Sequence, residues 1–244
     1  MKKLVKKLLY LLHLDITRNM QYDRKTERII KRVLSAGSTC VDIGCHRGEV
    51  LDTIIKQAPH GHHYAFEPIP ELFAELQERY RNRSVTVSDT ALSDATGTAE
   101  FNFIENAPAY SGLKIRRYDI SNPIIRTIKV TKDTLDRCLP GDEAVAFIKL
   151  DVEGGEFNVL RGARETIKRC RPVIVFECGL GSAEYYGTNP GDLHDFLTRE
   201  CGMNVSTLDR WLNGKTGVSR ERFEHLFETG AEYYFIAYPQ GDRR

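Results

Sequence analysis

One short segment, TCVDIGCHRGE, constrains this chain more than any other, because it joins an apolar run to an acid and two glycines. Val41 and Ile43 have the β-branched side chains typical of a buried strand. Gly44 and Gly48 allow the backbone to turn sharply and a ligand to approach closely. The residues that follow favour a helix, whose first amide groups would face that ligand. The segment therefore predicts a strand, a tight turn and a helix start around a binding site.

The spacing of the two glycines narrows the kind of site. Gly44 and Gly48 do not follow the G-x-G-x-x-G pattern that brings a helix N-terminus to a pyrophosphate. Their spacing resembles instead the first motif of methyltransferases that use S-adenosylmethionine (SAM). That resemblance implies that glycine backbone holds the amino-acid end of SAM, with Asp42 close by. Alone, the pattern also fits a strand end in another α/β domain.

Composition limits the domain count and the partners. A chain of 244 residues with 41% hydrophobic residues can bury one substantial core. The formal net charge of +1 provides no basic field for nucleic acid, which we therefore exclude as a partner. The six cysteines include no C-x-x-C pair and are interpreted as buried thiols in a reducing cytosol. The oligomeric state stays open.

The first residues, MKKLVKKLLYLLHLDI, place lysines ahead of a leucine-rich run. This run is too short to span a bilayer. His13, Asp15 and the lack of a small-residue cleavage site argue against an export signal. Residues 1–16 are then either an amphipathic helix on the inner membrane face or a helix packed on the protein's own core. We favour the second and expect a helical segment over residues 1–34.

An acid also ends the second predicted strand. Glu67 follows Tyr64-Ala65-Phe66 about one βα unit after the glycine turn, where an acid can accept the hydroxyls of a ribose. The alternative is an acid that caps the helix predicted over residues 70–81. The nearby His60, His62 and His63 are interpreted as part of a polar turn, because no further ligand follows at a zinc-like interval.

A third strand, predicted over residues 84–87, leads into Asp89, Thr90 and Ala91. In a SAM-binding sheet the loop after the third strand borders the adenine, so these residues are candidate adenine contacts. An ordinary polar loop is the alternative. Alternating patterns predict two more strands, over 99–103 and 128–131, and the aperiodic insertion between them is a candidate lid over the acceptor site.

A second acidic block follows a buried strand over residues 146–150 and contains Asp151 and Glu153. The next strand, over 173–177, ends in Glu177. Open α/β sheets bind ligands at the carboxyl ends of their strands. If these two strands are parallel neighbours, Asp151 and Glu177 lie side by side. Later patterns predict helices over 192–200 and 221–227 and strands over 203–208 and 232–238.

In combination, these blocks resemble the FkbM-type methyltransferases, a family of SAM-dependent O-methyltransferases. The matching features are D-x-G-x-x-x-G from Asp42, A-L-S-D at 91–94 with Gly97, K-L-D-V-E-G at 149–154 with Glu156, and V-L-R-G-A at 159–163. The resemblance covers roughly residues 38–180. Cys45-His46-Arg47 departs from the small residues and asparagine usual in the family.

The resemblance implies a fold and an activity. We expect a three-layer, Rossmann-like α/β domain over residues 35–244, with a mostly parallel seven-stranded sheet and an antiparallel last strand. The implied cofactor is SAM, held by Asp42, Gly44, Gly48 and Glu67 and, at the adenine, by Asp89, Thr90 and Ala91. The implied acceptor is a hydroxyl of a sugar, a bacterial glycan or a similar natural product.

Methyl transfer to an alcohol requires an in-line oxygen and the loss of a proton. Asp151, Glu153, Glu177 and His46 are the candidate bases. A rival mechanism binds Mg²⁺ through Asp151 and Glu177, but we favour a metal-independent route and assign no metal ligand. A rival of another class is a catalytically silent SAM- or nucleotide-binding module that scaffolds an assembly at the membrane.

Overall fold

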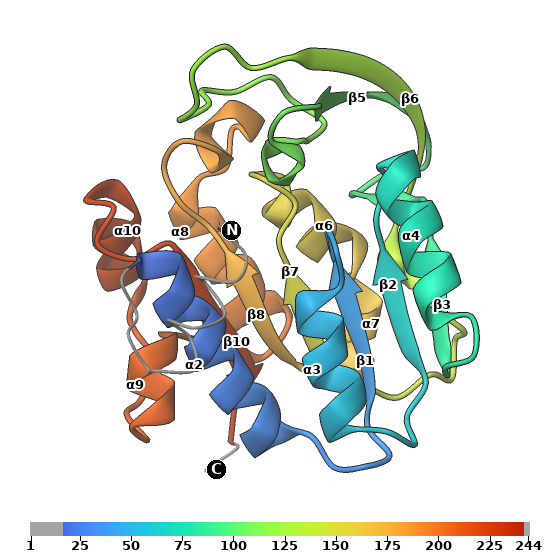
Figure 1. Ribbon diagram of the computed structural model, residues 1–244. Coiled ribbons are helices and arrows are strands. Elements are labelled where there is room, and N and C mark those ends of the chain that lie inside the picture. Colours follow the sequence, from blue (N-terminus) through green and yellow to red (C-terminus); the bar gives the residue numbers. More distant parts are fainter. Residues whose placement is uncertain (1–16, 242–244) are drawn as a thin grey trace.

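The computed structural model describes residues 17–241 (Figure 1). The lysine- and leucine-rich segment 1–16 lies outside the described residues, so both interpretations of it stay predictions. Between residues 17 and 241, no helix has the length and apolar character needed to cross a membrane.

Seven strands form the central sheet in the order β3-β2-β1-β7-β8-β10-β9. Their bounds are β1 Thr39–Ile43, β2 His63–Phe66, β3 Val85–Ser88, β7 Val145–Leu150, β8 Val173–Glu177, β9 Met203–Thr207 and β10 Tyr234–Pro239. The pairs from β3 to β8 are parallel, whereas β10, the last of these strands in the sequence, is antiparallel to both β8 and β9. The predicted mostly parallel sheet with an antiparallel last strand is confirmed. The strand order reverses between β1 and β7, which is where open α/β sheets bind ligands.

Helices cover both faces of this sheet (Figure 1). One face packs against α2 (Arg18–Val33), α3 (Glu49–Gln57) and α9 (Leu208–Leu212). The other packs against α5 (Leu135–Cys138), α6 (Glu156–Gly162), α7 (Arg164–Cys170), α8 (Pro190–Asp195) and α10 (Arg220–Glu228). α4 (Pro70–Tyr80) lies near β3 and shares a small apolar cluster with α3 and β2. The three predicted layers are therefore present.

The helix boundaries follow local signals. Thr17 caps α2 by accepting a hydrogen bond from the backbone N–H of Met20. Buried side chains recur on one face of α2, and Tyr22, Ile29 and Ile30 join the core beneath it. The helix predicted over 192–200 ends as a regular α-helix at Asp195 and continues as one π-helical turn, Phe196–Glu200.

A second, three-stranded sheet has the order β4-β6-β5, with β4 Ala91–Leu92, β5 Gly97–Ile104 and β6 Ile125–Asp133. The strands predicted over 99–103 and 128–131 thus exist, but they pair with each other outside the main sheet. Phe101, Phe103 and Val130 pack on Ile69 and Leu72, which fixes the small sheet against α4. Figure 1 shows β5 and β6 beyond the ends of the main strands. Two short 3-10 helices, Pro108–Tyr110 and Ala183–Tyr186, lie in the connections near this sheet.

Candidate active site

A cavity of about 940 Å³ opens where β1, β2 and β7 end. Residues from each of these strand ends line it, together with the start of β4 and parts of α2, α3 and the 105–124 insertion. Of the residues predicted from sequence, those that line the cavity are Asp42, Gly44, His46, Glu67, Thr90, Ala91, Asp151 and Glu153. Gly48, Asp89 and Glu177 do not line it. One cavity therefore brings most of the predicted cofactor and catalytic residues together.

The glycine turn is shaped by the protein's own packing as well as by any ligand. Gly44 has φ +72°, and a Cβ there would lie 1.8 Å from the backbone oxygen of Asp151. Gly48 has φ +75°, and its Cβ would lie 2.5 Å from the Tyr80 hydroxyl. Both positions therefore require glycine even without a ligand, and Gly44 ties the turn to the end of β7.

Glu67 is buried at the end of β2, with each carboxylate oxygen already held by the backbone. Its Oε2 accepts the N–H of His46 at 2.9 Å, and its Oε1 accepts the N–H of Ile69 at 3.0 Å. Burial raises the pKa of Glu67 to about 7, although these two hydrogen bonds act to lower it. A carboxylate oxygen can accept more than one hydrogen bond, so each oxygen keeps capacity for a ligand hydroxyl.

Asp42 is the least satisfied acid of the site. It is buried, and its Oδ2 has no hydrogen-bond partner in the described part of the chain. Burial raises the pKa of Asp42 to about 7, against the opposing effect of the Lys149 ammonium. A buried carboxylate oxygen without a hydrogen-bond partner raises the free energy of the folded state. A cationic ligand group in the cavity would remove that cost.

The predicted adenine contacts divide into two groups. Thr90 and Ala91 are buried and line the cavity, beside the apolar side chains of Ile69 and Phe101. Asp89 is exposed and does not line the cavity. The polar-loop alternative therefore describes Asp89 better, because the chain turns inward only where β4 begins.

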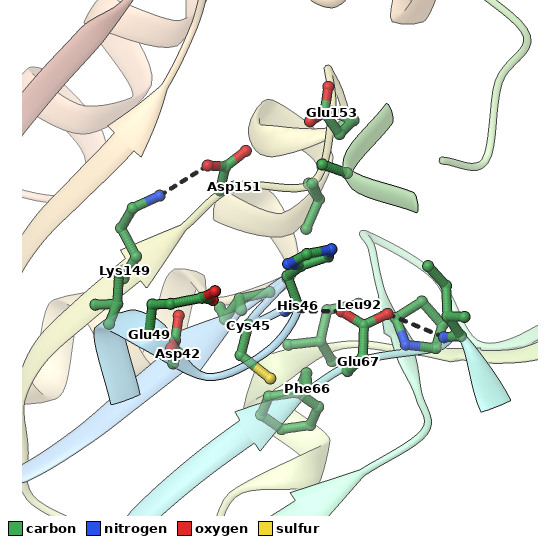
Figure 2. Close-up of a pocket in the computed structure, with 18 of the residues that line it drawn as sticks. Asp42, Cys45, His46, Glu49, Phe66, Glu67, Leu92, Lys149, Asp151 and Glu153 are labelled. Atoms are coloured by element: carbon green, nitrogen blue, oxygen red, sulfur yellow. Dashed lines mark hydrogen bonds and ion pairs between the residues drawn. The ribbon is translucent and has the colours of Figure 1, made fainter. Parts of the chain in front are cut away.

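The half of the cavity that contains Asp151 is predicted to be catalytic, and we term it the catalytic half (Figure 2). Lys149 Nζ donates to Asp151 Oδ2 at 3.1 Å, and the Tyr234 hydroxyl from β10 donates to the same oxygen. Lys149 Nζ also lies 3.4 Å from the Tyr234 oxygen. Although burial opposes both shifts, Lys149 lowers the pKa of Asp151 and Asp151 raises the pKa of Lys149. At neutral pH this arrangement holds an ionised carboxylate beside an ionised lysine.

Glu177 lies next to Asp151, as the predicted strand neighbours require. β7 pairs with β8 in parallel, with Leu150 opposite Phe176, which places Glu177 beside Asp151 at neighbouring strand ends. Burial and the Asp151 charge raise the pKa of Glu177 well above its usual range. The negative charge of Asp151 therefore disfavours ionisation of Glu177.

Glu153 and the 105–124 insertion close one side of the cavity. Glu153 has φ +61° and pairs with Arg116, whose side chain is only 7% exposed. The Arg116 guanidinium lies 5.1 Å from the ring centroid of Tyr110 and donates to the Gly181 carbonyl at 3.3 Å. Pro108, Ala109, Ser111 and Leu113 line the cavity, so the insertion forms part of its wall, and its role as a lid stays a prediction.

No group of three or more His, Cys, Asp or Glu side chains within residues 17–241 is arranged to hold a metal ion. In the predicted turn, His62 bonds the hydroxyls of Ser84 and Thr86, and His63 bonds the Ala58 carbonyl. These contacts account for the two histidines as structural residues.

The FkbM methyltransferase domain model matches residues 42–205. The chain belongs to this family. A 2-O-methyltransferase of Sinorhizobium fredii (strain NBRC 101917 / NGR234), NoeI, is 25% identical over 149 residues, which cover 54% of this chain and 59% of NoeI. The crystal structure of an FkbM methyltransferase from Methylobacillus flagellatus KT superposes with a TM-score of 0.52 at 19% identity, covering 84% of this chain and 44% of that one. The match therefore spans less than two thirds of either relative, and the structural likeness shows the shared fold.

Three parts of the site escaped the sequence analysis: Lys149, Tyr234 and the face of α2 that lines the cavity. The signal for Lys149 was available, because side chains two positions apart in a strand lie on one face, as Lys149 and Asp151 do. Tyr234 reaches Asp151 only because β10 is inserted beside β8, with Tyr234 opposite Glu177. No local pattern predicts that placement.

Proposed function

We propose that this protein transfers the methyl group of SAM to a hydroxyl oxygen of a sugar, a glycan or a similar natural-product acceptor. The observation that carries the proposal is the division of one cavity into two halves. The cofactor half contains the acids Asp42 and Glu67, and the catalytic half contains Asp151. Membership in the FkbM family supports methyl transfer, and the 2-O-methyltransferase NoeI supports oxygen as the accepting atom.

The residues of the cofactor half fit SAM. The unpaired Asp42 Oδ2 suits the ammonium of its amino-acid end, and Glu67 retains capacity for the ribose hydroxyls. Ile69, Ala91 and Phe101 offer an apolar bed for the adenine. When bound, SAM supplies an electrophilic methyl group on a positively charged sulfur.

Asp151 is the group best placed to receive the acceptor hydroxyl. Lys149 and Tyr234 hold its carboxylate in one orientation, and positioning of this kind supplies much of the rate acceleration in methyl transfer. As the new C–O bond forms and the C–S bond breaks, the hydroxyl proton passes to a carboxylate. The low pKa of Asp151 makes it a weak base, so orientation contributes more than proton removal.

The test measures SAM binding and transfer separately. Tritium-labelled methyl groups from SAM are followed into glycan extracts of the cells that encode the protein. We expect Asp151→Asn to lose most turnover while the SAM affinity measured by isothermal titration stays unchanged. We also expect transfer to survive exhaustive EDTA treatment.

Three outcomes would contradict the proposal. Activity that EDTA abolishes and Mg²⁺ restores would establish the metal-assisted mechanism instead. SAM binding without transfer to any extract would favour the silent-module hypothesis. Label in protein or nucleic acid alone would refute the proposed acceptor class.

A further inference from the structure

The cavity extends past the cofactor half into a groove between α2 and α3. Its walls are two helix faces, which together form what we term the α2–α3 groove: Asp23, Thr26, Glu27, Ile30 and Lys31 on α2, and Glu49, Val50, Asp52, Thr53, Lys56 and Gln57 on α3. The α2 positions recur at helical spacings of three and four, and the α3 positions form three adjacent pairs at the same spacings. The two helices therefore face each other across the groove along matching stripes.

The groove is longer than the amino-acid end of SAM requires. Glu49 lies in the first turn of α3, close enough to Asp42 to influence its charge. From Glu49 to Gln57 the helix rises roughly 12 Å at 1.5 Å per residue. The groove thus continues about two helical turns beyond the acid that suits the cofactor, which leaves room for a second ligand.

Within residues 17–241, one buried hydroxyl of the groove has no hydrogen-bond partner. The Thr26 side chain lines the cavity, the residue is only 3% exposed, and its Oγ1 makes no hydrogen bond in the described part of the chain. Leaving a buried hydroxyl without a hydrogen bond destabilises the protein. A bound hydroxyl would satisfy Thr26, whereas an apolar ligand would not.

The remaining lining matches a carbohydrate. Val50 provides apolar surface for the C–H faces of sugar rings, while Thr53, Gln57 and the lysines offer hydrogen-bond donors. Carboxylates of Glu49 and its neighbours offer acceptors. Sugar hydroxyls both donate and accept, so they can use such a mixed rim, and the nearby acids disfavour a polyanion.

The groove also lies partly outside the family domain. The family match begins at residue 42, whereas α2 ends at Val33. We propose that the α2–α3 groove binds the carbohydrate chain of the acceptor and presents one hydroxyl to Asp151. This inference rests on the proposed function, because it assigns the acceptor subsite of the same reaction.

The experiment uses the full chain and the labelled-methyl assay with a glycan extract. Thr53→Trp fills the groove, Thr26→Val removes the buried hydroxyl at nearly constant volume, and Gln21→Trp places the same bulk on an exposed α2 position outside the groove. We expect Thr53→Trp to require at least tenfold more extract for half-maximal labelling and Thr26→Val severalfold more. Both groove variants should match Gln21→Trp in maximal SAM binding, in SAM affinity and in melting temperature.

Each other outcome overturns the inference in a recognisable way. Labelling by Thr53→Trp with the extract dependence of Gln21→Trp would place the acceptor elsewhere and leave the proposed function intact. Loss of SAM affinity in Thr26→Val would assign this hydroxyl to the cofactor. If the unaltered protein binds SAM but labels no carbohydrate, the proposed function fails, and the groove fails with it.

Discussion

The cofactor half and the catalytic half of the cavity are built in different ways. Asp42 lies near the end of β1, while Glu67 follows β2 and Thr90 follows β3, so the cofactor half comes from one continuous stretch. The catalytic half joins Lys149 and Asp151 to Tyr234, which lies more than eighty residues further along the chain. Sequence motifs encode the first half, whereas the second depends on which strands become neighbours.

The two halves also differ in how their charges are compensated. In the cofactor half, burial raises the pKa values of Asp42 and Glu67 to about 7. In the catalytic half, Lys149 and Tyr234 compensate Asp151 and keep it ionised. The cofactor half therefore awaits a cationic ligand, while the catalytic half is organised before any ligand arrives. Four substitutions and one calorimetric measurement test this difference between the two halves.

Gly44→Ala tests whether the halves are joined at the turn. The left-handed backbone costs roughly 1–2 kcal/mol for alanine, and the Cβ would meet the Asp151 carbonyl at 1.8 Å. We expect the free energy of unfolding to fall by about 3 kcal/mol or more, measured by urea denaturation. Gly37→Ala is the control, because a Cβ there meets nothing within 4 Å. Equal effects of the two changes would disprove the link.

Lys149→Met tests the compensation of Asp151. Without the ammonium, Asp151 keeps the Tyr234 hydroxyl but loses its cationic partner, so the pKa of Asp151 should rise. We expect turnover near neutral pH to fall on the order of 100-fold, with activity recovering as pH increases. The exposed Lys129→Met is the matched control. A pH profile that keeps its shape in Lys149→Met would argue for a purely structural lysine.

Glu67→Ala tests the cofactor half. Losing hydrogen bonds to a carboxylate costs about 1.5 to 3 kcal/mol, so SAM affinity should fall by roughly tenfold or more in isothermal titration. Asp89→Ala changes an exposed acid outside the cavity and should bind SAM normally. Unchanged affinity in Glu67→Ala would remove the ribose assignment.

The raised pKa values predict proton release on SAM binding. A carboxyl group whose pKa is higher in the folded than in the unfolded state stabilises the fold at pH values below its ordinary pKa. This stabilisation is lost as the pH rises through about 7. A cationic ligand favours the ionised carboxylate, so the affinity for SAM should increase as the pH rises from 6 to 8. Near pH 7 we expect release on the order of half a proton per site, measured by calorimetry in buffers of different ionisation enthalpy. Asp42→Asn should reduce this release, and an unaltered value would contradict the assignment.

The smallest effect concerns the lid. Arg116, which is buried, joins the insertion to Glu153, whereas Arg117 is 79% exposed and lies 3.7 Å from Asp119. Exposed pairs contribute about 0–1 kcal/mol. Arg116→Ala should therefore speed limited proteolysis within residues 105–124 severalfold, while Arg117→Ala should leave the rate unchanged. Equal rates would show that the insertion is not fastened through Arg116.

The sequence predicted those parts of the fold that depend on local chemistry. The β1 turn, the helix after it and the strand that precedes Asp151 were all confirmed, because glycine spacing and apolar runs specify them locally. The family resemblance added the mostly parallel seven-stranded sheet and its antiparallel last strand. The small sheet was not foreseen, since an alternating pattern identifies a strand but not the sheet that it joins.

The candidate site was predicted unevenly for the same reason. Glu67 and Asp151 each follow a strand that the pattern of apolar residues identifies. Their places at the strand ends could therefore be predicted from the sequence. Tyr234 depends on β10 pairing with β8, and the groove face of α2 depends on where α3 lies. Such long-range neighbours leave no trace in local spacing.

The position of β10 has a consequence for synthesis of the protein. β9 pairs with the main sheet only through β10, and β8 has no neighbour on that side until β10 arrives. A nascent chain that has already emerged through β9 therefore carries an unpaired β8 edge and an unattached strand, a state that favours aggregation. It also lacks the hydroxyl that holds Asp151. We expect chaperone contact to be greatest at this length and methyl transfer to begin only after β10 has left the ribosome.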